Sequence, residues 1–148
     1  TFPHFSMNRQ CVNIRCRILH PDFEKDKYRP YWSNLPYAFF PAAIPELDYV
    51  FFVEGEKKAI VLKNHGLPAY GLWGIYGIKD NWLPWFMKRF SNRYLLFDSD
   101  RVSVILSAYR QANRLNAKPI FLRGKPDDLL SRGEIDADFI LQLAKETQ

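Results

Sequence analysis

The chain has 148 residues, a net charge of +5, a hydrophobic content of 47% and 25% charged residues. These ordinary values exclude a wholly disordered protein, and no apolar run approaches the roughly 20 residues that a membrane span needs. The sequence begins at Thr1 with no initiator methionine and no signal-peptide pattern. We therefore expect a cytoplasmic segment of a longer protein, with no membrane contact.

Residues 1–47 form a proline-rich and aromatic part with one clear period. Apolar and polar residues alternate over 12–18, which places Val12, Ile14, Cys16 and Ile18 on one face of a half-buried strand. The prolines that follow disfavour helices and central strands. We expect this part to be an N-terminal extension that contains one strand and packs on a core built elsewhere.

Residues 48–148 alternate between strand and helix patterns and are expected to form the main domain. Strands are predicted over 49–53, 68–73, 93–97 and 119–122, and helices over 56–65, 81–90, 102–115 and 138–145. This order predicts an α/β fold, a mostly parallel sheet of about four strands with helices on both faces. A Gly-Lys-Pro turn is expected at 124–126.

Acidic residues follow two of these strands. Glu54 follows the first strand, and Asp98 and Asp100 follow the third. In a parallel sheet the carboxyl ends of the strands share one edge, so these side chains are expected to converge there, and Gly55 allows a sharp turn. Converging carboxylates need a counter-charge, and Mg²⁺ supplies it with a preference for oxygen ligands.

A plainer explanation remains open for each acidic motif taken alone. Asp, Ser and related residues commonly cap helices. Glu54 can cap the helix after Gly55, and Ser99 or Asp100 can cap the helix that starts near Val102. Acidic motifs at the ends of two strands occur together less often than a single motif does, and this favours the metal site over two separate helix caps.

The motifs resemble the topoisomerase–primase (Toprim) domain. Glu54-Gly55 stands where that family has its Glu-Gly, and Asp98-Ser99-Asp100 stands where it has Asp-x-Asp, within a match over about residues 48–130. More narrowly, residues 53–59, 66–69, 96–100 and 124–129 look like the Toprim-type domain attached to phage and plasmid primase–helicases. Pro126 departs from that pattern, because the family has a glycine after the lysine.

The resemblance implies a compact Toprim-like fold and phosphodiester or nucleotidyl-transfer chemistry, as in a primase. It implies that Glu54 acts as general acid/base or metal ligand, and that Asp98 and Asp100 hold Mg²⁺, with Mn²⁺ as an alternative. Bacterial primases often carry an acid three residues after the motif glycine, where this chain has Lys58. A lysine there is either a phosphate contact or an ion-pair partner for the acids.

Basic and aromatic residues suggest an anionic partner. Four lysines at the same edge are candidate phosphate contacts, namely Lys57, Lys58, Lys79 and Lys125. Asp127 and Asp128 are either further acids of the site or caps of a short turn. Aromatic residues interleave with Lys25, Lys27 and Arg29, and either stack on single-stranded nucleic acid or pack in the core.

The leading interpretation is a Mg²⁺-dependent, nucleic-acid-processing domain of a primase or primase–helicase. Its expected partners are single-stranded DNA, nucleotides, and neighbouring polymerase or helicase domains of the parent chain. The alternative is a non-catalytic module that binds nucleic acid or acts as a scaffold in a larger replication protein. A phosphoacceptor signalling domain fits less well, because it needs an acid pair after the first strand.

Overall fold

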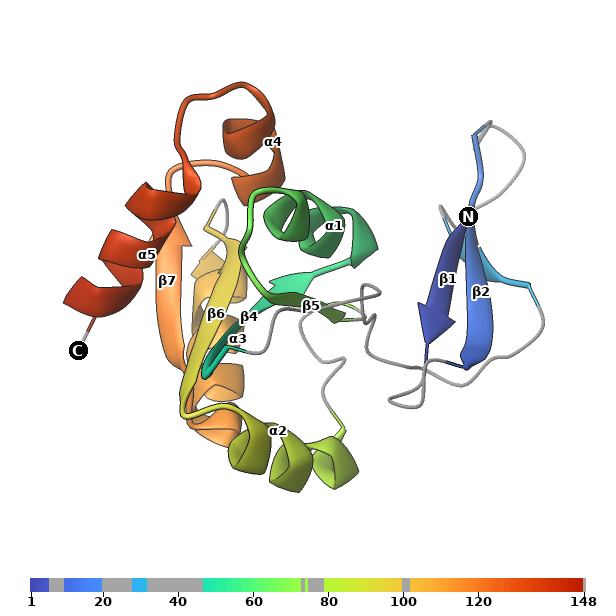
Figure 1. Ribbon diagram of the computed structural model, residues 1–148, viewed down its shortest axis with the longest axis horizontal. Coiled ribbons are helices and arrows are strands. Elements are labelled where there is room, and N and C mark those ends of the chain that lie inside the picture. Colours follow the sequence, from blue (N-terminus) through green and yellow to red (C-terminus); the bar gives the residue numbers. More distant parts are fainter. Residues whose placement is uncertain are drawn as a thin grey trace.

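The computed structural model describes residues 1–5, 10–19, 28–31, 47–72, 74, 79–99 and 102–147. Its centre is a four-stranded parallel sheet in the order β5-β4-β6-β7 (Figure 1). The strands are β4 Tyr49–Glu54, β5 Ala69–Leu72, β6 Asn92–Asp98 and β7 Lys118–Leu122. This sheet confirms the α/β fold that the strand and helix patterns predict.

Helices cover both faces of this sheet. They are α1 Glu56–Asn64, α2 Leu83–Arg89, α3 Val102–Leu115, α4 Pro126–Ser131 and α5 Ala137–Glu146, with a 3₁₀ turn, η2, over Asp80–Trp82. Alternate residues of β4 point to opposite faces. Phe51 joins a buried cluster with α1, α4 and α5, whereas Phe52 joins one with α2 and α3.

The chain bends at Gly124, where the Gly-Lys-Pro turn is expected, and the short helix α4 then begins at Pro126. Pro126 occupies its first turn, where its fixed φ suits a helix and its missing N–H costs no hydrogen bond. Asp127 and Asp128 also lie in this first turn. They are favourably placed against the helix dipole, although the residue preceding the helix, Lys125, makes no side-chain cap.

A separate antiparallel sheet, in the order β1-β2-β3, lies on the β5 side of the main sheet (Figure 1). It consists of β1 Phe2–Phe5, β2 Cys11–Arg17 and β3 Tyr28–Pro30. β2 is the strand expected from the alternation, and the other two pair on either side of it. The fully buried position of β2 is Asn13, while Cys16 is only half-buried and not in the core.

The apolar face predicted for β2 is therefore not its most buried face. Asn13 and Arg15 share the opposite face, and Arg15 contacts the start of α1. The polar face of β2 is covered because the small sheet docks against the main domain there.

Several expectations fall outside the described residues. These include the stretch over 32–46, the basic-aromatic residues Lys25, Lys27 and Trp32, and the later aromatics Trp73 and Tyr76. The division of the chain at residue 47 stays a prediction. Within the described ranges, no helix combines the length and the apolar character required to cross a bilayer.

Candidate functional site

Two acidic residues end neighbouring strands of the main sheet. Glu54 is the last residue of β4 and Asp98 the last of β6, and these strands are directly hydrogen-bonded in parallel. Both side chains line one cavity of about 530 Å³. The sequence pattern predicts both residues at this edge, and the structure places them in the same cavity.

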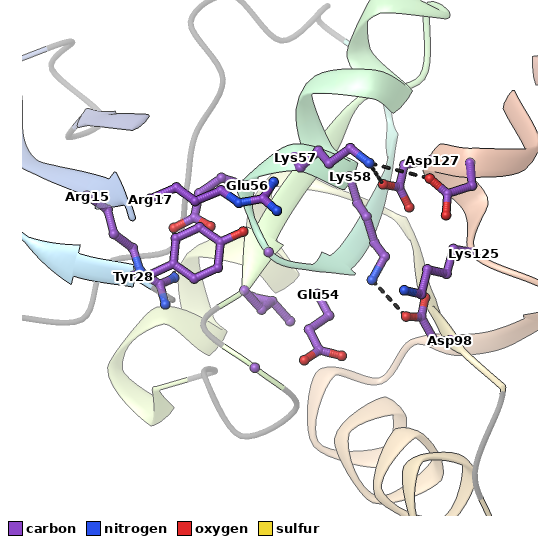
Figure 2. A pocket seen from close by; sticks show the side chains of 14 residues that line it. Arg15, Arg17, Tyr28, Glu54, Glu56, Lys57, Lys58, Asp98, Lys125 and Asp127 are labelled. Atoms are coloured by element: carbon purple, nitrogen blue, oxygen red, sulfur yellow. Dashed lines mark hydrogen bonds and ion pairs between the residues drawn. The ribbon is translucent and has the colours of Figure 1, made fainter. Parts of the chain in front are cut away.

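The cavity lies between the small antiparallel sheet and the acidic edge. Figure 2 shows Arg15, Arg17 and Tyr28 on one side, and Asp98, Lys125 and Asp127 on the other, with Glu54 between them. Five lining side chains are basic and five acidic: Arg15, Arg17, Lys57, Lys58 and Lys125, against Glu54, Glu56, Asp98, Asp127 and Asp128. What the cavity can bind therefore depends on which of these five basic side chains already make an ion pair with an acid.

Glycines make the turn between Glu54 and α1. Gly55 has φ 87° and ψ 164°, a conformation open essentially to glycine alone, and its N–H donates to the carbonyl of Leu72. On β5, a side chain at Gly71 would place its Cβ 2.7 Å from the carbonyl oxygen of Gly55. The motif turn thus depends on Gly55 for its dihedral angles and on Gly71 for space.

Lys58 reaches from α1 to the acid at the end of β6. Its Nζ donates to Asp98 Oδ2 at 3.0 Å, and the two side chains are only 12% and 14% exposed (Figure 2). Asp98 Oδ1 is buried and accepts no hydrogen bond within the described part of the chain. Of the two roles considered for Lys58, the structure shows the ion pair.

Lys57 makes the corresponding contact with α4. Its Nζ lies 2.8 Å from Asp127 Oδ2 and 3.4 Å from Asp128 Oδ1. The hydrogen bond with Asp127 is the main cause that raises the pKa of Lys57. Because the Lys57 side chain is 55% exposed, this pair contributes little to stability.

A buried ionic group ties the small sheet to the start of α1. Glu56 Oε1 accepts from His4 Nε2 at 3.2 Å and from Arg15 Nη1 at 2.9 Å. Burial by itself raises the pKa of Glu56, but the His4 hydrogen bond and the charge and hydrogen bond of Arg15 outweigh it and lower the pKa to about 2. Glu56 is therefore ionised, so His4 must act as donor at Nε2.

Arg17 and Lys125 supply cations that have no acidic partner in the described part of the chain. Both line the cavity, and neither makes an ion pair within the described ranges. Tyr28 adds an aromatic ring beside them, with the Arg15 guanidinium 4.6 Å from the ring centre. Tyr28 is one of the aromatic residues that interleave with Lys25, Lys27 and Arg29 in the sequence, whereas no motif singles out Arg17 or Glu56 as a site residue. Arg15 and Arg17 are polar positions of the alternating stretch, so the pattern places them on one face of a strand. It does not show that this face, once the small sheet docks, points toward the acids.

The remaining candidates are placed as follows. Asp100 lies outside the described residues. Lys79 is exposed just before η2 and is not among the residues that line the cavity. Glu54 does not cap α1, which has no side-chain cap, and the Ser99 hydroxyl donates to the carbonyl of Leu122.

The next feature is whether the acids described at this site could hold a metal ion. Among the residues that the structure describes, no three His, Cys, Asp or Glu side chains are grouped to hold one. Glu54 and Asp98 nevertheless offer carboxylate oxygens to the same cavity, and the buried Asp98 Oδ1 lacks a donor from the described residues. This oxygen-only donor set fits a hard divalent cation such as Mg²⁺.

Comparison with solved structures shows the same fold in primase catalytic cores. A DNA primase domain from Pseudomonas aeruginosa superposes with a TM-score of 0.78 at 18% identity, covering 97% of this chain and 49% of that one. The zinc-binding and RNA polymerase domains of the Aquifex aeolicus primase give 0.78 at 17% identity, covering 97% and 39%. A DnaG primase catalytic domain bound to single-stranded DNA gives 0.68 at 14% identity, covering 98% and 51%.

These similarities establish the primase type of Toprim fold, as expected from the motifs. This chain spans about half the length of most of these primase structures. No protein-family model matches the sequence. No curated protein matches it either.

Proposed function

We propose that this chain is a Mg²⁺-dependent Toprim domain that carries out nucleotidyl transfer or related phosphodiester chemistry within a primase or a phage- or plasmid-type primase–helicase. The observation that carries the proposal is the meeting of Glu54 and Asp98 in one cavity, which is also lined by Arg17 and Lys125, two cations with no acidic partner among the described residues. The fold shared with primase cores adds support.

In this proposal Glu54 and Asp98 hold Mg²⁺ or Mn²⁺, together with Asp100. The cation, when bound, stabilises negative charge on a phosphoryl oxygen. The carboxylate of Glu54 makes no hydrogen bond or ion pair within the described residues, so it is free to ligate the cation or to accept a proton from an attacking hydroxyl.

The same cavity offers contacts for a phosphate chain. Arg17 and Lys125 have no acidic partner among the described residues, and a guanidinium binds two phosphate oxygens at once. Tyr28 offers a flat surface for a base or sugar. We therefore propose nucleotides and single-stranded DNA as ligands, and polymerase or helicase domains as neighbours in the parent chain.

Binding of Mn²⁺ in the presence of inorganic phosphate tests the metal site. We expect wild type to bind Mn²⁺, as measured by loss of the free-ion signal in electron paramagnetic resonance, and Asp98→Asn and Glu54→Gln to lose this binding. Asp138→Asn is the matched control, because Asp138 is an exposed acid on α5 away from the cavity. Equal binding by Asp98→Asn and the control would overturn the proposal.

The Lys58–Asp98 ion pair favours a second candidate, a non-catalytic module that binds nucleic acid or positions neighbouring domains. The pair already neutralises the acid that a metal would use. Such a module retains its affinity for single-stranded DNA in Asp98→Asn, with an affinity that falls steeply with salt concentration. Retained, salt-dependent DNA binding without any Asp98-dependent binding of Mn²⁺ would favour this candidate over the enzyme.

A further inference from the structure

We propose that Lys58 makes cation binding at Asp98 depend on a bound phosphate. Without phosphate, the Lys58 ammonium occupies Asp98; with phosphate in the cavity, the ammonium moves to a phosphate oxygen and frees the carboxylate for the cation. This inference rests on the proposed function, because it concerns how the same site is loaded.

The contacts of Asp98 show why a cation and Lys58 compete. Oδ2 carries the ammonium at 3.0 Å, so a cation on either oxygen of this carboxylate, including Oδ1, which has no donor among the described residues, lies beside the positive charge of Lys58. Both side chains are largely shielded from solvent, so a second positive charge at Asp98 is screened little from the ammonium. The cation therefore binds well only when Lys58 has another anion to contact.

The geometry of Lys58 allows that exchange. An ammonium group has three N–H donors, and one hydrogen bond, to Asp98, is seen for Lys58 among the described residues. Arg17 and Lys125 line the same cavity, so a phosphate drawn there lies in the space that Lys58 also faces. A flexible four-carbon stem lets the ammonium move without displacement of α1.

Lys58 thus differs in role from its neighbour Lys57. Lys57 is 55% exposed and contacts the acids of α4, so solvent screens its charge and its pair does not involve Asp98. Of these two lysines, the shielded Lys58 is therefore the one that couples phosphate binding to cation binding.

Mn²⁺ titrations with and without inorganic phosphate test the proposal in wild type, Lys58→Met and Lys88→Met. Inorganic phosphate binds free Mn²⁺ weakly, so free Mn²⁺ can be calculated at each step. Lys88 is an exposed lysine of α2, at the opposite end of the sheet, and its replacement removes the same charge. Circular dichroism of each variant confirms its fold, and Lys58→Gln provides a second replacement should Lys58→Met fail to fold.

Wild type and Lys88→Met are expected to bind Mn²⁺ about 10- to 100-fold more tightly with phosphate than without it, within the usual range of couplings between two sites. Lys58→Met is expected to bind Mn²⁺ about tenfold more tightly than wild type without phosphate, and to show a smaller effect of phosphate. By linkage, Mn²⁺ must raise the phosphate affinity of wild type by the same factor.

The outcomes separate this inference from the proposed function. Asp98-dependent Mn²⁺ binding that is unaffected by phosphate and by Lys58→Met would overturn the inference and leave the proposed function standing. Absence of Asp98-dependent Mn²⁺ binding under every condition, in Lys58→Met as well, would overturn both. An equal gain in Mn²⁺ affinity in Lys58→Met and Lys88→Met would show a general charge effect and would also refute the inference.

Discussion

Acid should weaken the attachment of the small sheet through one residue, Glu56. This carboxylate is buried and holds His4 of β1 and Arg15 of β2. Its ordinary pKa of 4.5 falls to about 2 in the folded protein, and one pKa step corresponds to about 1.36 kcal/mol. Ionised Glu56 therefore contributes about 3 kcal/mol of stability at neutral pH.

The direction follows from the lowered pKa. Because the folded protein binds the Glu56 proton more weakly than the unfolded chain, the contribution is complete above about pH 4.5 and disappears as the pH falls toward about 2. Urea unfolding of wild type and Glu56→Gln over a series of pH values measures it, since other titrating groups cancel in the difference. The advantage of wild type should shrink by about 3 kcal/mol over this window.

A constant difference between wild type and Glu56→Gln from pH 5 to pH 2 would refute the assigned pKa and the role of the buried ion group. The replacement Glu56→Gln removes the buried negative charge and with it the carboxylate that Arg15 contacts. The neutral-pH cost of the replacement is thus expected to lie at about 3–5 kcal/mol, as for other broken buried pairs.

Two substitutions and one titration test the packing of the main domain. Gly71→Ala forces its Cβ against the Gly55 carbonyl oxygen, 2.7 Å away, and should lower the free energy of unfolding in urea by about 1–3 kcal/mol; an unchanged midpoint would contradict the close packing. Arg93→Met removes a buried guanidinium that donates to carbonyls at the ends of α2 and α3, and should cost about 2–4 kcal/mol in the same assay, whereas a cost below about 0.5 kcal/mol would show that these bonds are not needed. Burial raises the pKa of Tyr70 well above its usual value, so ultraviolet titration should show it ionising only as the protein unfolds in alkali; ionisation in the folded state would contradict its burial.

The main sheet was predictable because its signals are local. The apolar run over 49–53 has no polar face, as expected of a strand covered on both sides, and the structure buries Val50, Phe51, Phe52 and Val53 completely. Glu54 and Asp98 could be placed together for the same reason, since parallel strands end at one edge. These predictions needed only strand direction and the order of elements.

The walls of the cavity could not be predicted in this way. His4 and Glu56 are 52 residues apart, and their contact depends on how the small sheet docks rather than on any local pattern. Alternation in β2 correctly indicated a strand, but it could not show that the polar face is the covered one. The role of Arg17 and Tyr28 as cavity residues follows from that docking.

The role of Lys58 could be predicted only as one of two alternatives. Its place after the Glu54-Gly55 motif suggested either a phosphate contact or an ion pair, and periodicity cannot choose between them. The choice depends on the distance across the cavity to Asp98, which the packing of α1 on the sheet determines.

The central claim is that the acids ending β4 and β6 bind one divalent cation. Anomalous X-ray diffraction from crystals grown with Mn²⁺ and inorganic phosphate tests it most directly. We predict one strong anomalous peak between the carboxylates of Glu54 and Asp98, with Lys58 Nζ on phosphate. Fully occupied Mn²⁺ elsewhere, with Lys58 still on Asp98 and no peak between the two acids, would contradict the account.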